Sequence, residues 1–437
     1  MKRMIQPTEP ILRQGRRVLG WGRFLALVMT VAFAALLGRV VQIQQRPDET
    51  IVQQMSHRGS TGQLPSRRGA LVDRVGRPVA LTHTGYRLFA DPSLVDNPQI
   101  FATELAYKLG ENAAEYDRAF SLGFQRRYVV LDPLLSPEQV QTVRKMKHPA
   151  LGLEMRSVRT YPNGHRAGQV IGFVGRDHKG LGGLERALNK QLTGRTGRVR
   201  VLRDVRRRAI WVDAESFESP RDGRDVQLTI DLEIQRYAED ALRETCRSFS
   251  ADRGELLVLD AKNGQVMAMA NWPFFNPAEV KGASPATQRN RCLTDPYEPG
   301  SIFKPFVFAA ALDEGVVRSR DIIDTTTSGR WIYRRRKLHD SHPHGRITWD
   351  KVLVYSSNIG MGKIGVRMGS RRLHRAVVRF GFGSRTGLGL GGESRGLVQP
   401  LRKWNPIYSV TSVPMGQEIA VTPIQMASAF TALANGG

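Results

Sequence analysis

Ser301 and Lys304 have the residue types and the spacing needed for covalent acyl transfer. They stand in Glu298-Pro-Gly-Ser-Ile-Phe-Lys-Pro-Phe306, where Pro-Gly predicts a turn and the apolar run that follows predicts a buried helix stopped by Gly315. Ser301 then lies at the helix start, where free backbone N–H groups favour developing negative charge. Lys304 follows one turn later, so its ammonium can reach back to the serine hydroxyl. Because apolar neighbours disfavour the charged form, the pKa of this lysine should fall, and the lysine can act as a base for Ser301.

A second group of polar residues strengthens this pattern, because Ser-x-x-Lys alone is common by chance. Tyr355-Ser-Ser-Asn-Ile-Gly360 supplies Ser-x-Asn beside another apolar stretch. The hydroxyl of Ser356 can relay a proton to a leaving group, and the carboxamide of Asn358 can both hold Lys304 and bind a substrate amide. The alternative is that Ser-Ser-Asn only caps a helix.

Three weaker patterns point to other chemistry and are not favoured. Residues 339–344 are rich in histidine, but a proline and a loop setting argue against a metal site. The glycines of residues 387–392 fit Gly-x-Gly-x-x-Gly without the strand, turn and helix that a dinucleotide site needs. Cys246 and Cys292 are predicted to be free thiols, with a disulfide as the alternative. We therefore expect no cofactor and no metal.

Hydrophobic periodicity predicts the elements that must position these residues. Residues 226–230 have a strand pattern, Asp231 is a good helix cap, and residues 232–249 predict a helix with one apolar face. Two short apolar runs, 255–260 and 265–270, are joined through Asn-Gly, which is typical of a tight hairpin. A helix and a hairpin in this order indicate an α/β domain built on an antiparallel sheet.

An apolar run near the N-terminus predicts a membrane anchor. Residues 24–38 carry no charge, and apolar neighbours extend the run towards the roughly 20 residues that cross a bilayer. Six basic residues and one acidic residue precede it, which by the positive-inside rule puts the N-terminus in the cytoplasm and everything after Gln44 outside. A cleaved signal peptide is the alternative, but the small-x-small pattern Ala32-Phe-Ala34 lies inside the apolar run and not after it.

Length and charge limit the function further. The 437 residues carry 65 Lys and Arg against 40 Asp and Glu, a net charge of +25. This length suggests two or three domains, and 41% hydrophobic residues rule out wholesale disorder. An exported chain does not meet genomic nucleic acid, so we assign the positive charge to a membrane surface or an anionic wall polymer.

Taken together, these segments resemble the class B penicillin-binding proteins, which are monofunctional peptidoglycan D,D-transpeptidases with a single membrane anchor. The resemblance covers nearly the whole chain after residue 20, and its motifs occur in the family's order. They are Arg68-Gly-Ala-Leu-Val-Asp-Arg74, Gly182-Gly-Leu-Glu185, Leu228-Thr-Ile-Asp231, Gly264-Gln-Val-Met-Ala-Met-Ala270, Tyr297-Glu-Pro-Gly-Ser-Ile-Phe-Lys304, Ser356-Ser-Asn358, Phe380-Gly-Phe-Gly383, Val421-Thr-Pro-Ile-Gln425 and Ala434-Asn-Gly436.

The resemblance implies a role for each candidate residue. Ser301 would attack the D-alanyl-D-alanine carbonyl of a stem peptide, and Lys304 would take the serine proton. Ser356 would pass a proton to the leaving D-alanine, and Asn358 would position the peptide. The acyl-enzyme would then pass to the amine of a neighbouring strand, and β-lactams would acylate Ser301 irreversibly. The implied partners are stem peptides, β-lactam antibiotics, membrane lipid, a polytopic membrane glycosyltransferase and other division proteins, with no nucleic acid.

The predicted fold class is α+β with several domains. We expect a cytoplasmic tail at residues 1–22, a transmembrane anchor at 23–43, and a mixed α/β pedestal domain of the dimerisation type at 44–221. Residues 222–437 would form a transpeptidase domain of the penicillin-binding and β-lactamase-like type, with helices on an antiparallel sheet. The compact pedestal favours a role in cell division over one in elongation.

The chain departs from the family at one motif. The family closes its site with Lys-Thr-Gly on a strand beside the serine and lysine, and this sequence contains no Lys-Thr-Gly. Arg385-Thr-Gly387 and Arg195-Thr-Gly197 imitate it at the wrong places. We therefore expect a C-terminal truncation of about 100 residues by domain size, and a fragment that is inactive.

Two other functions remain open on the sequence. One is a catalytically inactive, membrane-anchored scaffold of the wall-synthesis complex. The other is a β-lactam sensor or a β-lactamase, which shares Ser-x-x-Lys, although a β-lactamase needs no long pedestal.

Overall fold

The computed structural model describes residues 9–45, 59–123, 126–175, 177–203 and 209–436. Most of the predicted connector at residues 44–58 lies outside these ranges. The chain divides into two compact units, one made of residues 1–64 and 196–220 and the other of residues 65–195 and 221–437. The predicted domain boundaries stay predictions, because this division follows packing and not the order of the chain.

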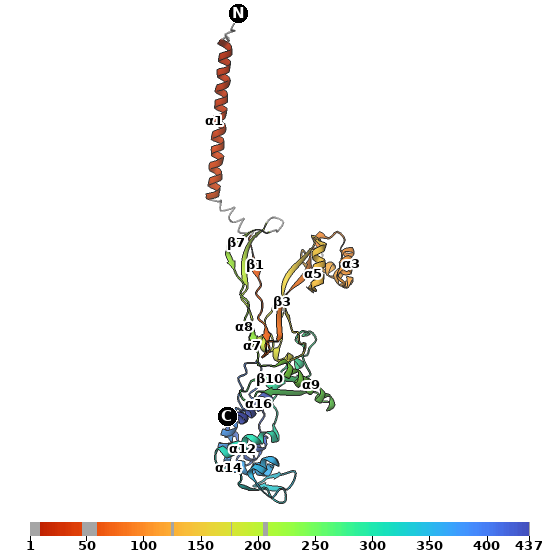
Figure 1. Ribbon diagram of the computed structural model, residues 1–437, viewed down its shortest axis with the longest axis vertical. Helices are drawn as coiled ribbons and strands as arrows, with labels where there is room; N and C mark the ends of the chain where they lie inside the picture. The colour runs from red at the N-terminus through yellow and green to blue at the C-terminus, as the bar shows by residue number, and fades with distance from the viewer. Residues whose placement is uncertain (1–8, 46–58, 124–125, 176, 204–208, 437) are drawn as a thin grey trace. The chain divides into compact units, whose positions relative to one another are not determined.

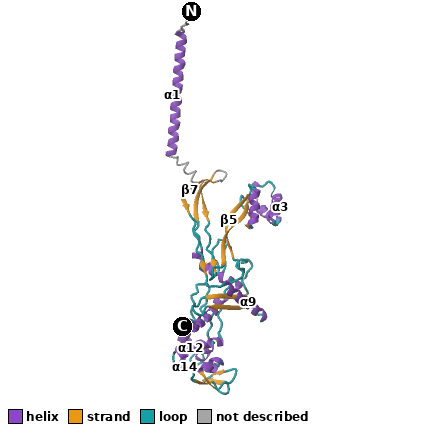
Figure 2. Cartoon of the chain, viewed as in Figure 1, coloured by secondary structure: helices purple, strands orange, loops and turns teal. Residues whose placement is uncertain are grey.

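The first unit contains a long helix and a small sheet. Helix α1 (Glu9–Gln45) includes the apolar stretch Gly20–Gln42, which has a mean hydropathy of 2.3 and is exposed throughout among the residues that the structure describes. The predicted anchor at residues 23–43 falls inside α1. Strands β1 (Gly59–Leu64), β6 (Gly197–Arg203) and β7 (Ala209–Glu218) pair antiparallel in the order β1-β6-β7, drawn in orange in Figure 2.

The second unit begins with a five-stranded sheet and three helices (Figure 1). Its strands follow the order β4-β3-β2-β8, and β5 also pairs with β3. Helices α3 and α5 begin at the side-chain caps Asn97 and Ser136, and with α4 they enclose an apolar core around Phe120. The bounds are β2 (Leu71–Val72), β3 (Pro78–Ala90), β4 (Val129–Leu135), β5 (Leu151–Thr160), β8 (Val226–Gln227), α3 (Pro98–Leu109), α4 (Ala113–Gly123) and α5 (Pro137–Met146).

A buried ion cluster joins three distant segments of this unit. Glu185 in α7 (Gly183–Ala187) is fully buried and accepts hydrogen bonds from Arg68 Nε at 2.7 Å and Arg159 Nε at 2.8 Å. Arg159 also donates to the Gly69 carbonyl at 2.7 Å. A buried carboxylate needs such partners, because an unpaired charge in the interior is strongly destabilising. The Arg-Gly-Ala and Gly-Gly-Leu-Glu motifs therefore meet in space.

The second half of the unit is built on the predicted helix and hairpin. Helix α9 (Leu232–Ser248) packs on β9 (Gly254–Leu259) and β10 (Val266–Trp272), which pair antiparallel. Both predictions are confirmed. The predicted strand at residues 226–230 is shorter, because Asp231 accepts hydrogen bonds from the first N–H groups of α9 and the chain turns into that helix.

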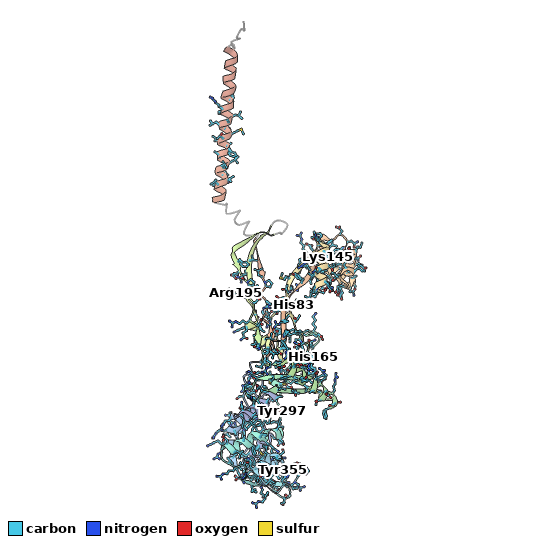
Figure 3. All side chains as sticks on the ribbon, viewed as in Figure 1. His83, Lys145, His165, Arg195, Tyr297 and Tyr355 are labelled. Carbon is cyan, nitrogen blue, oxygen red and sulfur yellow. The ribbon has the colours of Figure 1, made fainter. Side chains whose placement is uncertain are left out.

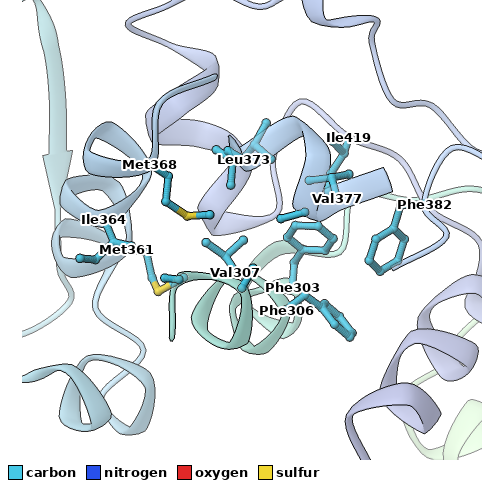
Figure 4. Close-up of a cluster of buried hydrophobic side chains, with 14 of the residues drawn as sticks. Phe303, Phe306, Val307, Met361, Ile364, Met368, Leu373, Val377, Phe382 and Ile419 are labelled. Carbon is cyan, nitrogen blue, oxygen red and sulfur yellow. The ribbon is translucent and has the colours of Figure 1, made fainter. Parts of the chain in front are cut away.

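The remaining elements surround an aromatic and aliphatic core. Phe303, Phe306 and Phe382 pack with ring centroids 5.0–5.5 Å apart (Figure 4), and α12 packs against α14 (Figure 1). The other bounds are η1 (Pro92–Leu94), α6 (Gly168–Ile171), α8 (Asn189–Leu192), α10 (Pro285–Gln288), α11 (Arg291–Thr294), η2 (Gly300–Phe303), α12 (Lys304–Asp313), β11 (Ile322–Asp324), β12 (Arg330–Tyr333), β13 (Arg336–His339), β14 (Arg346–Thr348), α13 (Trp349–Val354), α14 (Asn358–Arg379), η3 (Leu401–Lys403), α15 (Ser409–Ser412), η4 (Val413–Met415) and α16 (Pro423–Asn435).

Candidate active site

Ser301 lies exposed at the start of a helical segment. The predicted helix begins as a short 3-10 turn, η2, which continues directly into α12. Gly300 opens this turn with a φ of 57° and donates its N–H to the Gly416 carbonyl at 3.0 Å. The large aromatic side chain of Phe303, on the same turn, is fully buried. The serine is thus exposed to solvent on a turn that a backbone hydrogen bond and a buried aromatic side chain hold in place.

Lys304 is almost completely buried, with 1% of its surface exposed. Its Nζ donates to the Ser356 carbonyl at 2.5 Å, to Ser356 Oγ at 2.9 Å and to Asn358 Oδ1 at 2.8 Å. Burial lowers the pKa of Lys304 to about 8, and the negative charge of Asp340 opposes that shift. An ammonium with three oxygen acceptors and a pKa near neutrality is suited to exchange protons.

The three residues of the Ser-Ser-Asn segment have two structural roles: one caps a helix and two bind Lys304. Ser357 caps α14, because its hydroxyl accepts from the Gly360 N–H at 2.9 Å. Ser356 and Asn358, on either side of the cap, both bind Lys304. Ser356 adopts a φ of 53°, which is costly for a residue with a Cβ. Capping was the alternative on the sequence, and the structure shows that Ser357 is the cap while Ser356 and Asn358 contact Lys304.

One expected contact differs from the prediction. The sequence placed the Lys304 ammonium within reach of the Ser301 hydroxyl. In the described part of the chain, the hydrogen bonds of Lys304 go to Ser356 and Asn358, and none joins it to Ser301. The physical reason is that an ammonium donates only, and the Ser356 turn offers it three oxygens at once.

Sequence reasoning missed two residues that shape the site. Asp340, directly after β13, accepts from Ser357 Oγ at 2.6 Å and from the Ile359 N–H at 3.0 Å. Gly416 has a φ of 75°, and a Cβ there would lie 2.1 Å from the Gly300 carbonyl oxygen. The available signals were an aspartate within the histidine-rich segment and the turn sequence Pro-Met-Gly.

The patterns that were set aside have ordinary structural roles. No group of metal-ligating side chains occurs among the described residues. His344 stacks on Tyr355, with ring centroids 4.7 Å apart, and Tyr355 is labelled in Figure 3 within the α12–α14 region. Thr386 donates its N–H and its hydroxyl to the buried Glu393.

The two cysteines are buried free thiols, as predicted. Burial raises the pKa of the Cys292 thiol well above its ordinary value. A thiol in that state is a poor nucleophile, because the thiolate is the reactive form. Neither cysteine therefore competes with Ser301 as a candidate for covalent chemistry.

The fold and the site geometry define a class: a transpeptidase domain preceded by a pedestal and an apolar N-terminal helix. Residues 63–228 match the penicillin-binding protein dimerisation domain, and residues 254–437 match the penicillin-binding protein transpeptidase domain.

Comparison with known proteins supports the same class. The Escherichia coli (strain K12) peptidoglycan D,D-transpeptidase FtsI is 31% identical over 413 residues, which cover 93% of this chain and 69% of that protein. Penicillin-binding protein 3 of Mycobacterium tuberculosis, in complex with aztreonam, is 26% identical with a TM-score of 0.62, covering 86% of this chain and 66% of that one. Penicillin-binding protein 2X of Streptococcus thermophilus shares the fold at 23% identity, with a TM-score of 0.69 over 86% of this chain and 60% of that one. The chain belongs to the class B penicillin-binding proteins.

Proposed function

We propose that this protein is a peptidoglycan D,D-transpeptidase that cross-links stem peptides through an acyl-enzyme on Ser301, and that β-lactams acylate the same serine. The observation that carries the proposal is the buried Lys304, one turn after an exposed serine and bound to both Ser356 and Asn358. Family membership makes peptidoglycan and β-lactams the expected ligands.

The acylation step follows from the states of these groups. With a pKa of about 8, roughly one lysine in ten is neutral at pH 7. Neutral Lys304 takes the proton of Ser301 Oγ as that oxygen attacks the penultimate D-alanine carbonyl. The backbone N–H of Ser301, at the start of a helical segment, supports the oxyanion. When the C–N bond breaks, Ser356 passes a proton from Lys304 to the leaving amine of D-alanine, and the acyl group stays on Ser301.

In this proposal, Asn358 holds the peptide. Its Oδ1 accepts from Lys304 at 2.8 Å, and one Nδ2 hydrogen donates to the His339 carbonyl at 3.1 Å. An amide nitrogen has two hydrogens, so the second can bind a substrate carbonyl. In the final step, the amine of a second stem peptide attacks the ester and releases Ser301.

The proposed setting is septal wall synthesis. The N-terminus would lie in the cytoplasm, with α1 as a single-pass anchor in the cytoplasmic membrane and the catalytic unit outside. Partners would be a polytopic membrane glycosyltransferase and other division proteins. The support is the similarity to FtsI and the basic residues that precede the apolar stretch.

The test is covalent labelling by a fluorescent penicillin, in a chimera that carries a family Lys-Thr-Gly strand after Gly437. Ser301→Ala should abolish labelling, and Lys304→Ala should abolish it while the protein still folds. Ser319→Ala, which changes an exposed serine elsewhere, is the matched control and should label normally. Labelling that persists in Ser301→Ala would refute the assignment of the nucleophile.

A further inference from the structure

Asp340 accepts two hydrogen bonds from the turn that binds Lys304. One carboxylate oxygen accepts from Ser357 Oγ at 2.6 Å, and the other accepts from the Ile359 N–H at 3.0 Å. Ser357 is 1% exposed and Asp340 is half-buried, so this hydrogen bond is largely shielded from water. Hydrogen bonds to an ionised carboxylate are stronger than neutral ones. The two donors alternate along the chain with Ser356 and Asn358, the residues that contact the lysine.

The residue directly before these two donors is held in an unfavourable backbone conformation. Ser356 has a φ of 53°, and a left-handed residue with a Cβ persists only when its surroundings fix it. In that conformation, its carbonyl and its hydroxyl both bind Lys304, at 2.5 Å and 2.9 Å. Asp340 and the preceding carbonyl of His339, which binds Asn358, supply the fixed surroundings.

Three other charged groups on the neighbouring elements bind other partners. On α13, Asp350 binds Thr348 and Lys351 lies over the Tyr355 ring. On α14, Lys363 donates to the Asp324 carbonyl. In the described chain, Asp340 is the charged group that acts on Lys304.

We propose that Asp340 is a positioning residue for the acyl transfer: it fixes the Ser356–Asn358 turn through Ser357 and Ile359, and so holds in place the oxygens that bind Lys304. The negative charge of Asp340 also favours the ammonium form of Lys304. The part of this proposal that concerns acyl transfer rests on the function proposed above. The effect of Asp340 on the proton affinity of Lys304 is independent of that function, and it can be measured without any reaction.

The first experiment is a ¹³C NMR titration of the lysine Cε signals in the 437-residue protein, with Lys304 assigned by Lys304→Arg. Asp340→Asn should lower the pH at which Lys304 titrates, because a negative charge favours the ammonium form. Asp350→Asn is the matched control, since it removes an equal charge that binds Thr348, and should leave the titration unchanged. An unchanged or raised titration pH in a folded Asp340→Asn protein would overturn the proposal.

A second variant separates the effect of the Ser357–Asp340 hydrogen bond from the effect of the Asp340 charge. It also tests the proposal if Asp340→Asn does not fold. Ser357→Ala keeps the carboxylate but removes its buried donor. Labelling of the chimera by fluorescent penicillin should slow about tenfold or more, as expected for the loss of a hydrogen bond to a charged group, while the Lys304 titration stays near its original pH. Labelling at the unmodified rate would overturn the positioning role.

The two proposals fail separately. If Ser301→Ala still labels, the proposed function fails, and the titration of Lys304 still decides the role of Asp340. If Ser301→Ala loses labelling but Asp340→Asn alters neither titration nor rate, only the positioning role fails.

Discussion

Lys304 shows how a single buried charge can be made reactive. Burial disfavours its ammonium form, while three oxygen acceptors and the nearby Asp340 favour it. The balance leaves the pKa at about 8, lowered from the usual 10.5. A lysine with this pKa exists in both forms close to physiological pH, which suits the proposed role of accepting and then returning a proton.

A pH dependence follows from this pKa. Below about pH 8, Lys304 is mostly protonated and cannot take the serine proton. The acylation rate of the chimera should therefore rise about tenfold per pH unit up to that region and level off above it. The measurement is the second-order acylation constant with fluorescent penicillin between about pH 6 and 10. A rate that is flat through this range, or that falls as the pH rises, would contradict the assignment of Lys304 as the base.

At the scale of elements, the position of Ser301 depends on a close approach of two backbones. Gly416, after η4, accepts the hydrogen bond from the Gly300 N–H at 3.0 Å. Tyr297 and Val421 exchange two further backbone hydrogen bonds, at 3.0 Å and 2.9 Å. The turn that carries the serine is therefore fixed by a segment far along the chain.

Gly416→Ala tests this approach. The left-handed φ of 75° alone should cost about 1–2 kcal/mol of folding free energy, and the new Cβ would also meet the Gly300 backbone. Gly381→Ala is the control, because Gly381 has a φ of 84° but open space around it. We expect a larger loss of stability in chemical denaturation for Gly416→Ala than for Gly381→Ala, together with slower penicillin labelling. Equal losses for the two variants would show that the close approach does not matter.

At the scale of the whole molecule, an apolar helix and a catalytic unit belong to one chain. The stretch Gly20–Gln42 of α1 is long and apolar enough to cross a membrane, and the wall substrate lies outside the cell. The function proposed for Ser301 therefore requires the catalytic unit to be exported.

The orientation can be tested in intact cells. Gln54→Cys should react with a membrane-impermeant thiol reagent, and Thr8→Cys should react only after the cells are opened. The unmodified protein serves as the control, because Cys246 and Cys292 are both buried. The reverse labelling pattern would refute the orientation and, with it, the wall substrate.

The absence of Lys-Thr-Gly from the 437 residues leads to the last prediction. By the family resemblance, the Lys-Thr-Gly strand would supply a second oxyanion donor. We therefore expect the 437-residue chain to label at least about 10²-fold more slowly than the chimera, because loss of one such donor alone typically has this effect. In the described chain, β9 pairs only with β10, and an unpaired strand edge promotes aggregation. Protease resistance should therefore also be lower without the added strand. Equal labelling of the 437-residue chain and the chimera would contradict this prediction and would indicate that Arg385-Thr-Gly387 substitutes for Lys-Thr-Gly.

The sequence by itself determined the local elements and the identity of the candidate residues. Caps, turns and periodicity depend on neighbours along the chain, so the helix at residues 232–248 and the hairpin at residues 254–272 could be predicted. Ser301, Lys304, Ser356 and Asn358 could be chosen because their spacing and the family motifs carry the signal.

Tertiary structure alone decided which of these residues meet and what holds them. Three contacts join segments that are separated in sequence. They are the hydrogen bonds of Lys304, the hydrogen bond from Ser357 to Asp340, and the approach of Gly416 to Gly300. An ammonium group binds whichever oxygens the fold brings to it, and no local pattern encodes that choice. The lowered pKa of Lys304 has the same origin, because burial is a property of the packed core and not of the residue.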